Sequence, residues 1–312
     1  MKKIAYMFPG QGSQEVGMGK HIYDHDATIK EIYNEANQLL NKDISKLMFE
    51  GPAEELTETE NAQPALLLSS IAVHRLLLKE GIQPVMTVGH SLGEYSALVA
   101  AGAISLEEAL PLVAERGRLM EAAFPKGQGT MAAVLGMKQD EIEMVIDKVE
   151  SGIVDLANIN CPGQIVISGD KEGIEEAITL LKEAGAKRVL PLNVSGPFHS
   201  RLMKSANEGM AKYLNEIKIK DAVIPVYANV SAQPVTDSEQ IKDLLIKQLY
   251  SPVRFEDSIR NMMNIGVDAF VEIGNGKVLS GLVKKIHRRN HTFAIQDIDS
   301  LKDFLHWYKE EA

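Results

Sequence analysis

Short apolar runs alternate, over the first hundred residues, with longer stretches in which apolar residues recur every three or four positions. The runs KIAYMF (residues 3–8) and QPVMTVG (residues 83–89) have the length of buried strands. The stretches with helical spacing are residues 27–40, 63–79 and 92–101. Strands that alternate with helices in this way predict a parallel α/β sheet.

A further helix is expected to begin after Ser105. Ser105 and Glu108 have the spacing of a capping box, in which each residue satisfies a free N–H group at the start of a helix. Pro111 lacks an N–H group and would cost this helix a hydrogen bond, so a kink or a restart is expected there.

The segment 128–192 follows a different pattern. Its strand-like runs are residues 130–135, 153–159, 164–168 and 186–192, and its helical stretches are residues 139–149 and 171–183. This β-α-β-β-α-β order is typical of a ferredoxin-like unit. Strand-like runs return at residues 224–228 and 269–273. The sequence therefore predicts a large α/β domain formed by residues 1–127 and 193–312, into which a small ferredoxin-like domain of residues 128–192 is inserted.

The composition indicates a folded globular protein and argues against several functions. The 312 residues are 45% hydrophobic and 24% charged, with no apolar stretch long enough to cross a membrane. The apolar run at residues 4–8 is too short for the core of a signal peptide, and Cys161 is the only cysteine, which predicts a cytoplasmic protein without internal disulfides. The net charge of −10 argues against general binding of nucleic acids. Because no Cys/His cluster has zinc spacing, we expect no metal.

A strand-turn-helix pattern surrounds Ser91. The sequence Gly89-His90-Ser91-Leu92-Gly93 follows a strand-like run and opens a helix, which is the context that a nucleophile elbow of the type Gly-x-Ser-x-Gly requires. The glycines avoid side-chain clashes in the tight turn, and the helix directs free N–H groups and its positive dipole end at the serine. This pattern predicts a nucleophilic serine; the alternative is a serine that only caps a buried helix.

A nucleophilic serine needs a general base, and His199 is the favoured candidate among eight histidines. It lies in SGPFHSRLM, between a strand-like run and a helix, where side chains project into the cleft at the edge of a parallel sheet. His90 is adjacent to the serine but is expected to point away from it. The other histidines lie in a helix or in segments expected to be exposed: His21, His25, His74, His287, His291 and His306. Spacing alone favours His199 without excluding the others.

The loop FPGQGSQ (residues 8–14) also follows a strand-like run. Gly10 and Gly12 flank Gln11 and would let the backbone approach a ligand and turn an N–H group towards it. Such a group would complete an oxyanion hole beside the N–H that follows the nucleophile. A dinucleotide-binding loop is excluded, because Glu15 stands where the third glycine of G-x-G-x-x-G belongs. A glycine turn with a purely structural role remains the alternative.

Arg116 is the most informative charged residue. On its helix, apolar residues lie one turn before and one turn after it: Leu112, Val113, Leu119 and Met120. An inward guanidinium needs an anionic partner, because a buried and unpaired charge is very costly. Either an internal carboxylate or the carboxylate of a ligand, held by the two-pronged guanidinium, would supply that partner.

Seven segments follow one another along the chain: FPGQGSQ, ENAQPALL, GHSLGEYSAL, ERGRLM, NCPGQIVISG, GPFHSRLMK and KQLYSPVRF. In this order they resemble the malonyl-CoA:acyl carrier protein transacylases and the related acyltransferase domains of polyketide synthases. The resemblance covers almost the entire chain. The length of the chain is similar to that of the free-standing enzymes of dissociated fatty acid synthesis. The resemblance implies an α/β-hydrolase-like large domain beside the ferredoxin-like insert.

The resemblance also implies roles for the residues that carry the chemistry. Ser91 would be the acylated nucleophile and His199 its base. Gln11 and Leu92 would supply the N–H groups of the oxyanion hole. The backbone carbonyl of Gln248 would orient the histidine, so that a dyad replaces the usual triad.

Four further residues would bind the substrate. Arg116 would hold the free carboxylate of the malonyl group, and Gln63 and Asn160 match positions that line the pocket. Phe198, just before the histidine, matches an aromatic position that goes with selection of malonyl over methylmalonyl.

The resemblance implies malonyl-CoA and the phosphopantetheine thiol of acyl carrier protein as substrates, with no cofactor, and we expect a monomer. Carrier proteins are usually acidic and this chain is acidic too, so docking requires a local basic patch. The best candidates for it are Lys284, Lys285, Arg288 and Arg289. The alternative functions are a discrete polyketide acyltransferase with another carrier and a serine esterase or thioesterase, to which an inward Arg116 would be of no use. A non-catalytic scaffold on the same fold is disfavoured by the intact Ser91, His199 and Arg116.

Overall fold

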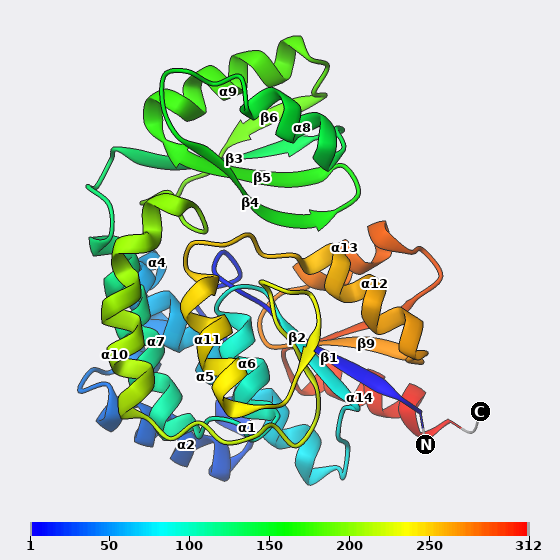
Figure 1. Cartoon of the computed structure of the whole chain (residues 1–312). Coiled ribbons are helices and arrows are strands. Elements are labelled where there is room, and N and C mark those ends of the chain that lie inside the picture. Colours follow the sequence, from blue (N-terminus) through cyan, green and yellow to red (C-terminus); the bar gives the residue numbers. More distant parts are fainter. Residues whose placement is uncertain (1, 311–312) are drawn as a thin grey trace.

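The computed structural model describes residues 2–310 and contains two β-sheets (Figure 1). The larger sheet has the strand order β10-β9-β1-β2-β7-β8. Its strands are β1 (Ile4–Phe8), β2 (Met86–Gly89), β7 (Val226–Tyr227), β8 (Pro234–Val235), β9 (Ala269–Ile273) and β10 (His291–Ile295). All neighbouring strands are parallel except β8, which pairs with β7 in the antiparallel direction. The predicted α/β class with a parallel sheet is therefore confirmed.

Strand β1 lies inside the sheet, and both of its faces are covered by helices. Ile4, Tyr6 and Phe8 contribute to one apolar core, and Ala5 and Met7 contribute to another. The helices that pack into the first core are α2 (Ala27–Leu39), α5 (Thr59–Lys79), α6 (Gly93–Ala100), α7 (Leu106–Ala122), α10 (Asn207–Glu216), α11 (Ser238–Gln248) and α14 (Ile298–Lys309). The second core is closed by α12 (Phe255–Ile265) and α13 (Val278–Ile286). Burial on both faces explains why β1 is apolar at every position rather than at alternate ones.

Three short helices lead from β1 to α5, and a short 3-10 helix leads into α10. They are α1 (Lys20–His25), α3 (Ile44–Glu50), α4 (Ala53–Thr57) and η1 (Arg201–Ala206). Across residues 2–310, no helix is both long enough and apolar enough to span a bilayer.

The smaller sheet has four strands in the order β4-β5-β3-β6, and every neighbouring pair is antiparallel. Its elements are β3 (Gly129–Leu135), α8 (Gln139–Ile146), β4 (Val154–Cys161), β5 (Gln164–Asp170), α9 (Lys171–Glu183) and β6 (Arg188–Pro191). They enclose an apolar core of their own, and in Figure 1 both helices lie on the side of the sheet away from the larger one. A backbone bridge joins the two parts of the molecule: Ile159 N–H donates to Val253 O at 2.8 Å, and Val253 N–H donates to Ala157 O at 2.7 Å.

Helix α7 departs from the sequence prediction in one respect. Ser105 accepts a hydrogen bond from Glu108 N–H at 3.3 Å, as the capping spacing predicts, and the helix then continues unbroken to Ala122. The expected restart of the helix at Pro111 is wrong. Pro111 lies on the exposed face, while Leu110 and Leu112 on either side are buried, so packing of the inward face outweighs the loss of one hydrogen bond.

Candidate active site

Ser91 lies in a strained turn between β2 and α6, at the carboxyl edge of the larger sheet. Its backbone has a φ of +52°, a value that non-glycine residues rarely adopt. The two motif glycines allow this turn. A Cβ atom on Gly89 would come within 1.8 Å of the Gly93 carbonyl carbon, and one on Gly93 within 2.0 Å of the Phe8 carbonyl oxygen. The turn is therefore pressed against the end of β1 and holds the Ser91 hydroxyl away from the sheet.

His199 forms the hydrogen bond to Ser91 that a general base requires. Ser91 Oγ and His199 Nε2 are 2.8 Å apart, and His199 Nδ1 lies 2.9 Å from the backbone carbonyl of Gln248. A carbonyl can only accept, so Nδ1 carries the proton and Nε2 is free to accept the serine proton. Burial, together with the positive charge of Arg116, lowers the pKa of His199 to about 3, which keeps the imidazole neutral.

Arg116 reaches the same point from α7 and is fully buried, as the helical spacing predicts. Its Nη1 donates to Gln63 Oε1 at 2.8 Å, and its Nη2 donates to Gln248 Oε1 at 2.9 Å and to Ser91 Oγ at 3.1 Å. Its Nε has no hydrogen-bond partner within residues 2–310, and no carboxylate of these residues lies within ion-pair distance of the guanidinium. The cation stacks over the ring of Tyr95 at 5.3 Å. A buried cation thus lies beside the serine, held by neutral groups only.

The two backbone N–H groups expected to form an oxyanion hole are unused within the described chain. Neither Gln11 N–H nor Leu92 N–H donates a hydrogen bond to any of these residues. The loop that carries Gln11 packs directly on the elbow, because a Cβ atom on Gly10 would lie 2.2 Å from the His90 carbonyl oxygen. The side chain of Gln11 turns away and donates to Thr59 at 3.2 Å.

The remaining substrate-binding candidates lie around this centre. Asn160, at the end of β4, accepts a hydrogen bond from His90 Nε2 through its Oδ1 at 2.8 Å, which turns His90 away from the serine. Burial lowers the pKa of His90, so that ring is also neutral. Phe198 is buried in the core of the larger sheet, next to His199 in the chain.

Two residues of this network, Asn229 and Glu94, were missed by sequence reasoning. Asn229 accepts from Ser91 N–H at 2.8 Å and donates to the Gly89 carbonyl at 2.7 Å. Glu94, only 2% exposed, accepts from Asn229 N–H at 3.1 Å and from Gln248 Nε2 at 2.7 Å through one carboxylate oxygen. Burial raises the pKa of Glu94 to about 7. Asn229 could have been noticed as a polar residue after a short apolar run, but Glu94 resembles any acidic residue in the first turn of a helix.

A cavity of about 790 Å³ opens beside His199, between the smaller sheet and the larger part of the molecule. Its lining includes Gln139, Glu143, Leu156, Ile159, Tyr250 and Arg254. This volume is within the range of sites that bind small organic ligands. His199, only 4% exposed, is thus one of the residues that line this cavity.

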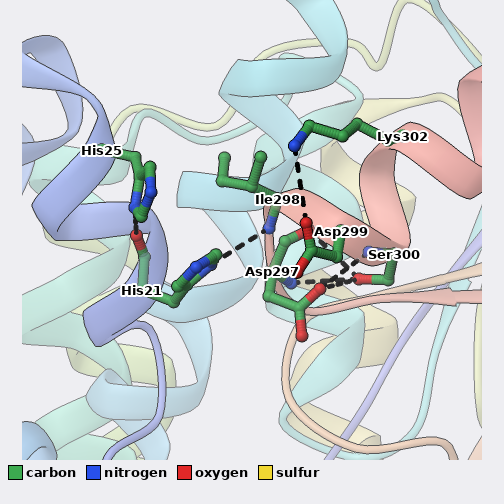
Figure 2. A network of polar contacts seen from close by, with 7 residues as sticks. All are labelled: His21, His25, Asp297, Ile298, Asp299, Ser300 and Lys302. Atoms are coloured by element: carbon green, nitrogen blue, oxygen red, sulfur yellow. Dashed lines mark hydrogen bonds and ion pairs between the residues drawn. The ribbon is translucent and has the colours of Figure 1, made fainter.

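The other histidines and the basic residues considered for docking lie elsewhere. His21 and His25 belong to α1, with ring centroids 4.3 Å apart and rings tilted by 46°. Figure 2 shows His21 directed at the start of α14, where Ile298 N–H donates to His21 Nδ1 at 3.4 Å. Of the four basic residues near the end of α13, Lys285 donates to Gln164 of the small sheet at 2.9 Å. Residues 2–310 hold no group of three or more His, Cys, Asp or Glu side chains arranged for a metal ion.

Comparison with known proteins identifies the family of this chain. The model of the acyl transferase domain matches residues 5–298. The chain is 55% identical to the malonyl CoA-acyl carrier protein transacylase of Bacillus subtilis, over 100% of this chain and 99% of that protein. It is also similar to the crystal structure of an acyl carrier protein S-malonyltransferase from Vibrio cholerae, with a TM-score of 0.95 and 45% identity over 97% of this chain and 99% of that one. A malonyl-transacylase in complex with a type II polyketide acyl carrier protein matches with a TM-score of 0.95 and 40% identity, over 97% of this chain and 99% of that one. The chain therefore belongs to the acyltransferase family that includes the malonyl CoA-acyl carrier protein transacylases.

Proposed function

We propose that this protein transfers a malonyl group from malonyl-CoA to the phosphopantetheine thiol of acyl carrier protein, through a malonyl ester on Ser91. The observation that carries this proposal is the fully buried Arg116, which lies 3.1 Å from the Ser91 hydroxyl without a carboxylate partner among the described residues. A cation kept unpaired beside a nucleophile fits an acyl group that brings its own carboxylate. The transfer supplies malonyl units for fatty acid biosynthesis.

In the first half-reaction, Ser91 Oγ attacks the thioester carbonyl while His199 Nε2 takes the hydroxyl proton. The N–H groups of Gln11 and Leu92 stabilise the oxygen that becomes negative, and the loss of one such donor typically costs a factor of about 10² to 10³ in rate. The C–S bond then breaks, and CoA leaves as its thiol with the proton that His199 held. The malonyl group stays on Ser91 as an ester.

In the second half-reaction, the pantetheine thiol of the carrier gives its proton to His199, and its sulfur attacks the ester carbonyl. The C–O bond breaks, Ser91 Oγ recovers the proton from His199, and the malonyl thioester of the carrier is released. The backbone carbonyl of Gln248 holds the imidazole in the same tautomer throughout. The cavity beside His199 would admit the pantetheine arm in both steps.

Arg116 would clamp the malonyl carboxylate, and binding has a second effect on the dyad. The carboxylate would offset the positive charge that lowers the pKa of His199, so the imidazole becomes a stronger base when the substrate is in place. Gln63 would hold Nη1 of the arginine. Asn160 would line the pocket and hold His90 by its hydrogen bond. Phe198 would restrict the space at the α-carbon of the acyl group.

We also propose the finer description of the fold. Residues 1–127 and 193–312 would form an α/β-hydrolase-like domain, and residues 128–192 a ferredoxin-like domain. The strand order β4-β5-β3-β6, all antiparallel, with one helix after the first strand and one after the third, supports the second label. We further propose that the protein acts as a monomer in the cytoplasm and that the carrier docks on Lys284, Lys285, Arg288 and Arg289.

The alternatives make different predictions for one experiment. The protein is mixed with labelled malonyl-CoA, the adduct on Ser91 is identified by mass spectrometry of peptides, and holo carrier protein or buffer is then added. A transacylase keeps the adduct in buffer and passes the label to the carrier, whereas an esterase or thioesterase releases free malonate in both cases. Parallel assays with a fatty acid carrier and a polyketide carrier identify the acceptor. Release of malonate at the same rate with and without carrier would overturn the proposal.

A further inference from the structure

We infer that Glu94 is a positioning residue that holds both members of the Ser91–His199 dyad, through Asn229 on one side and Gln248 on the other. The inference rests on the proposed acyl transfer at Ser91 and adds to it the group that keeps Ser91 and His199 at hydrogen-bond distance.

The first connection supports the strained elbow. Asn229 bonds to the Gly89 carbonyl at 2.7 Å and to Ser91 N–H at 2.8 Å, so its side chain spans the turn in which Ser91 has a φ of +52°. A residue in this conformation persists only when its surroundings hold it there. The backbone N–H of Asn229 donates to Glu94 at 3.1 Å. Glu94 therefore holds Asn229 in place, and Asn229 holds the turn at Ser91.

The second connection sets the orientation of Gln248, which is itself fully buried. The amide nitrogen of its side chain donates to Glu94 at 2.7 Å, closer than to Ser91 O at 3.1 Å or Asn229 Oδ1 at 3.3 Å. Because Gln248 Nε2 donates to Glu94, the amide oxygen points the other way and accepts from Arg116 Nη2 at 2.9 Å. The backbone carbonyl of the same residue holds His199 Nδ1 at 2.9 Å. Glu94 therefore fixes the orientation of Gln248, which contacts both His199 and Arg116.

The arrangement also explains why the Arg116 guanidinium has no carboxylate partner among the described residues. The Gln248 amide bonds to Glu94 with its nitrogen and to Arg116 with its oxygen, so the only buried acid of this site is kept one side chain away from the guanidinium. A direct ion pair would occupy the donors that a substrate carboxylate needs.

A purely structural role is the competing explanation, and the molecule offers a matched control for it. Glu272 is fully buried and also accepts two hydrogen bonds, from Leu279 N–H at 3.0 Å and Ser280 N–H at 2.8 Å. These donors are the first N–H groups of α13, and none of them contacts Ser91 or His199. Loss of Glu272 should therefore affect stability without affecting the dyad.

The test uses the full-length protein and two reactions at Ser91. The first is malonylation by malonyl-CoA, which needs Arg116. The second is labelling by a fluorophosphonate, which bonds phosphorus to Ser91 Oγ, expels fluoride, and carries no carboxylate. Rates are measured for Glu94→Met, Glu94→Gln, Glu272→Met and Glu272→Gln, with thermal unfolding recorded for each.

Glu94→Met should slow both reactions by about 100-fold, with little change in KM for malonyl-CoA, because displacement of reacting groups by about 1 Å costs that much. Glu94→Gln keeps one acceptor oxygen and should slow them by about tenfold, because a neutral acceptor is weaker than a charged one. The Glu272 variants should react at the wild-type rate per folded molecule.

Wild-type rates of fluorophosphonate labelling in folded Glu94→Met would overturn the inference. If Glu94→Met does not fold, Glu94→Gln decides alone, and an unchanged labelling rate in that variant overturns it. If the wild-type protein is labelled by the fluorophosphonate but never malonylated, the proposed function fails while the positioning role is still measured by the labelling rates.

Discussion

The two sheets of this molecule bury very different groups. The six-stranded sheet and its helices enclose charged or titratable side chains, whereas the four-stranded sheet and its two helices enclose no charged side chain among the described residues. The groups buried around the larger sheet include Glu94, Arg116, His199, Glu272 and His74, and the polar residues buried in the smaller one are Asn160 and Ser168. Burial of a charge is costly unless something offsets the cost, so such groups gather where a protein uses them. The buried charged and titratable groups thus gather around the larger sheet, and the smaller sheet contributes one hydrogen bond to the elbow, from His90 to Asn160.

Removal of the proposed nucleophile should have the largest effect on transfer. Ser91→Ala should abolish the malonyl adduct and reduce transfer by a factor on the order of 10⁶, as for other enzymes that lose a serine nucleophile. Circular dichroism should remain that of the wild type, because alanine occupies the same turn. Transfer at a substantial fraction of the wild-type rate would show that the elbow is not the reactive centre.

Removal of the buried cation should have the next largest effect. Arg116→Ala should reduce kcat/KM for malonyl-CoA by about 30- to 5,000-fold, since truncation of one partner in a desolvated charge pair costs about 2–5 kcal/mol. Acetyl-CoA, which has no carboxylate, should be affected far less. Arg118→Ala is the matched control, because Arg118 is on the same helix but exposed and paired with Glu115. Equal losses for the two acyl groups would reject Arg116 as the clamp.

The titration of His199 is expected to change with the same substitution. Burial is the larger cause of its low pKa and the Arg116 charge is the second. The wild-type imidazole should therefore stay neutral down to about pH 4, and Arg116→Ala should raise its pKa while leaving it below the ordinary value of about 6.5. NMR titration of the ring, assigned with a His199→Gln variant, measures both values. A wild-type ring that titrates near pH 6.5 would contradict the buried environment.

A smaller effect is expected where α13 meets the small sheet. Lys285 contacts Gln164 of the small sheet, so the proposed docking patch lies across the boundary. Lys285→Glu combined with Arg289→Glu should raise KM for carrier protein about tenfold at low ionic strength and weaken its salt dependence, without slowing malonylation by malonyl-CoA. The control is Lys30→Glu with Lys46→Glu, which changes the net charge equally at exposed positions of α2 and α3. Equal KM values for the two double variants would reject the patch.

The smallest effect should come from the core of the small sheet. Ser168 is fully buried, and its hydroxyl has no hydrogen-bond partner within residues 2–310. Ser168→Ala should leave malonyl transfer unchanged and the free energy of unfolding equal or higher by up to about 1 kcal/mol, because an unsatisfied polar group is removed. A clear loss of activity in this variant would show that the small domain takes part in the chemistry.

Local pattern was sufficient to predict much of the fold. The apolar runs of β1 and β9 and the six elements of the insert follow from residues close together in the sequence. The strand-like run at residues 224–228 contains β7, whereas β8, with two residues, is too short to leave a pattern. The continuation of α7 through Pro111 depends on packing that the sequence does not display.

The site was predictable to a different extent. The glycines around Ser91 and the apolar neighbours of Arg116 are local signals, and they identified the elbow and the inward cation. His199 could only be favoured, because its approach to Ser91 is a tertiary contact between residues 108 positions apart. Asn229 and Glu94 were missed for the same reason, since their bond joins residues 135 positions apart.

The wide spacing of these residues has a consequence for the protein during its synthesis. The turn at Ser91 lies between β2 and α6, yet Asn229, which holds this turn, and Gln248, whose carbonyl orients the base, follow Ser91 by 138 and 157 positions. A ribosome that has made the first half of the chain therefore carries a serine that cannot be acylated efficiently. We therefore expect malonyl-CoA to acylate Ser91 only after α11 has emerged and packed, so that unfinished chains stay unmodified.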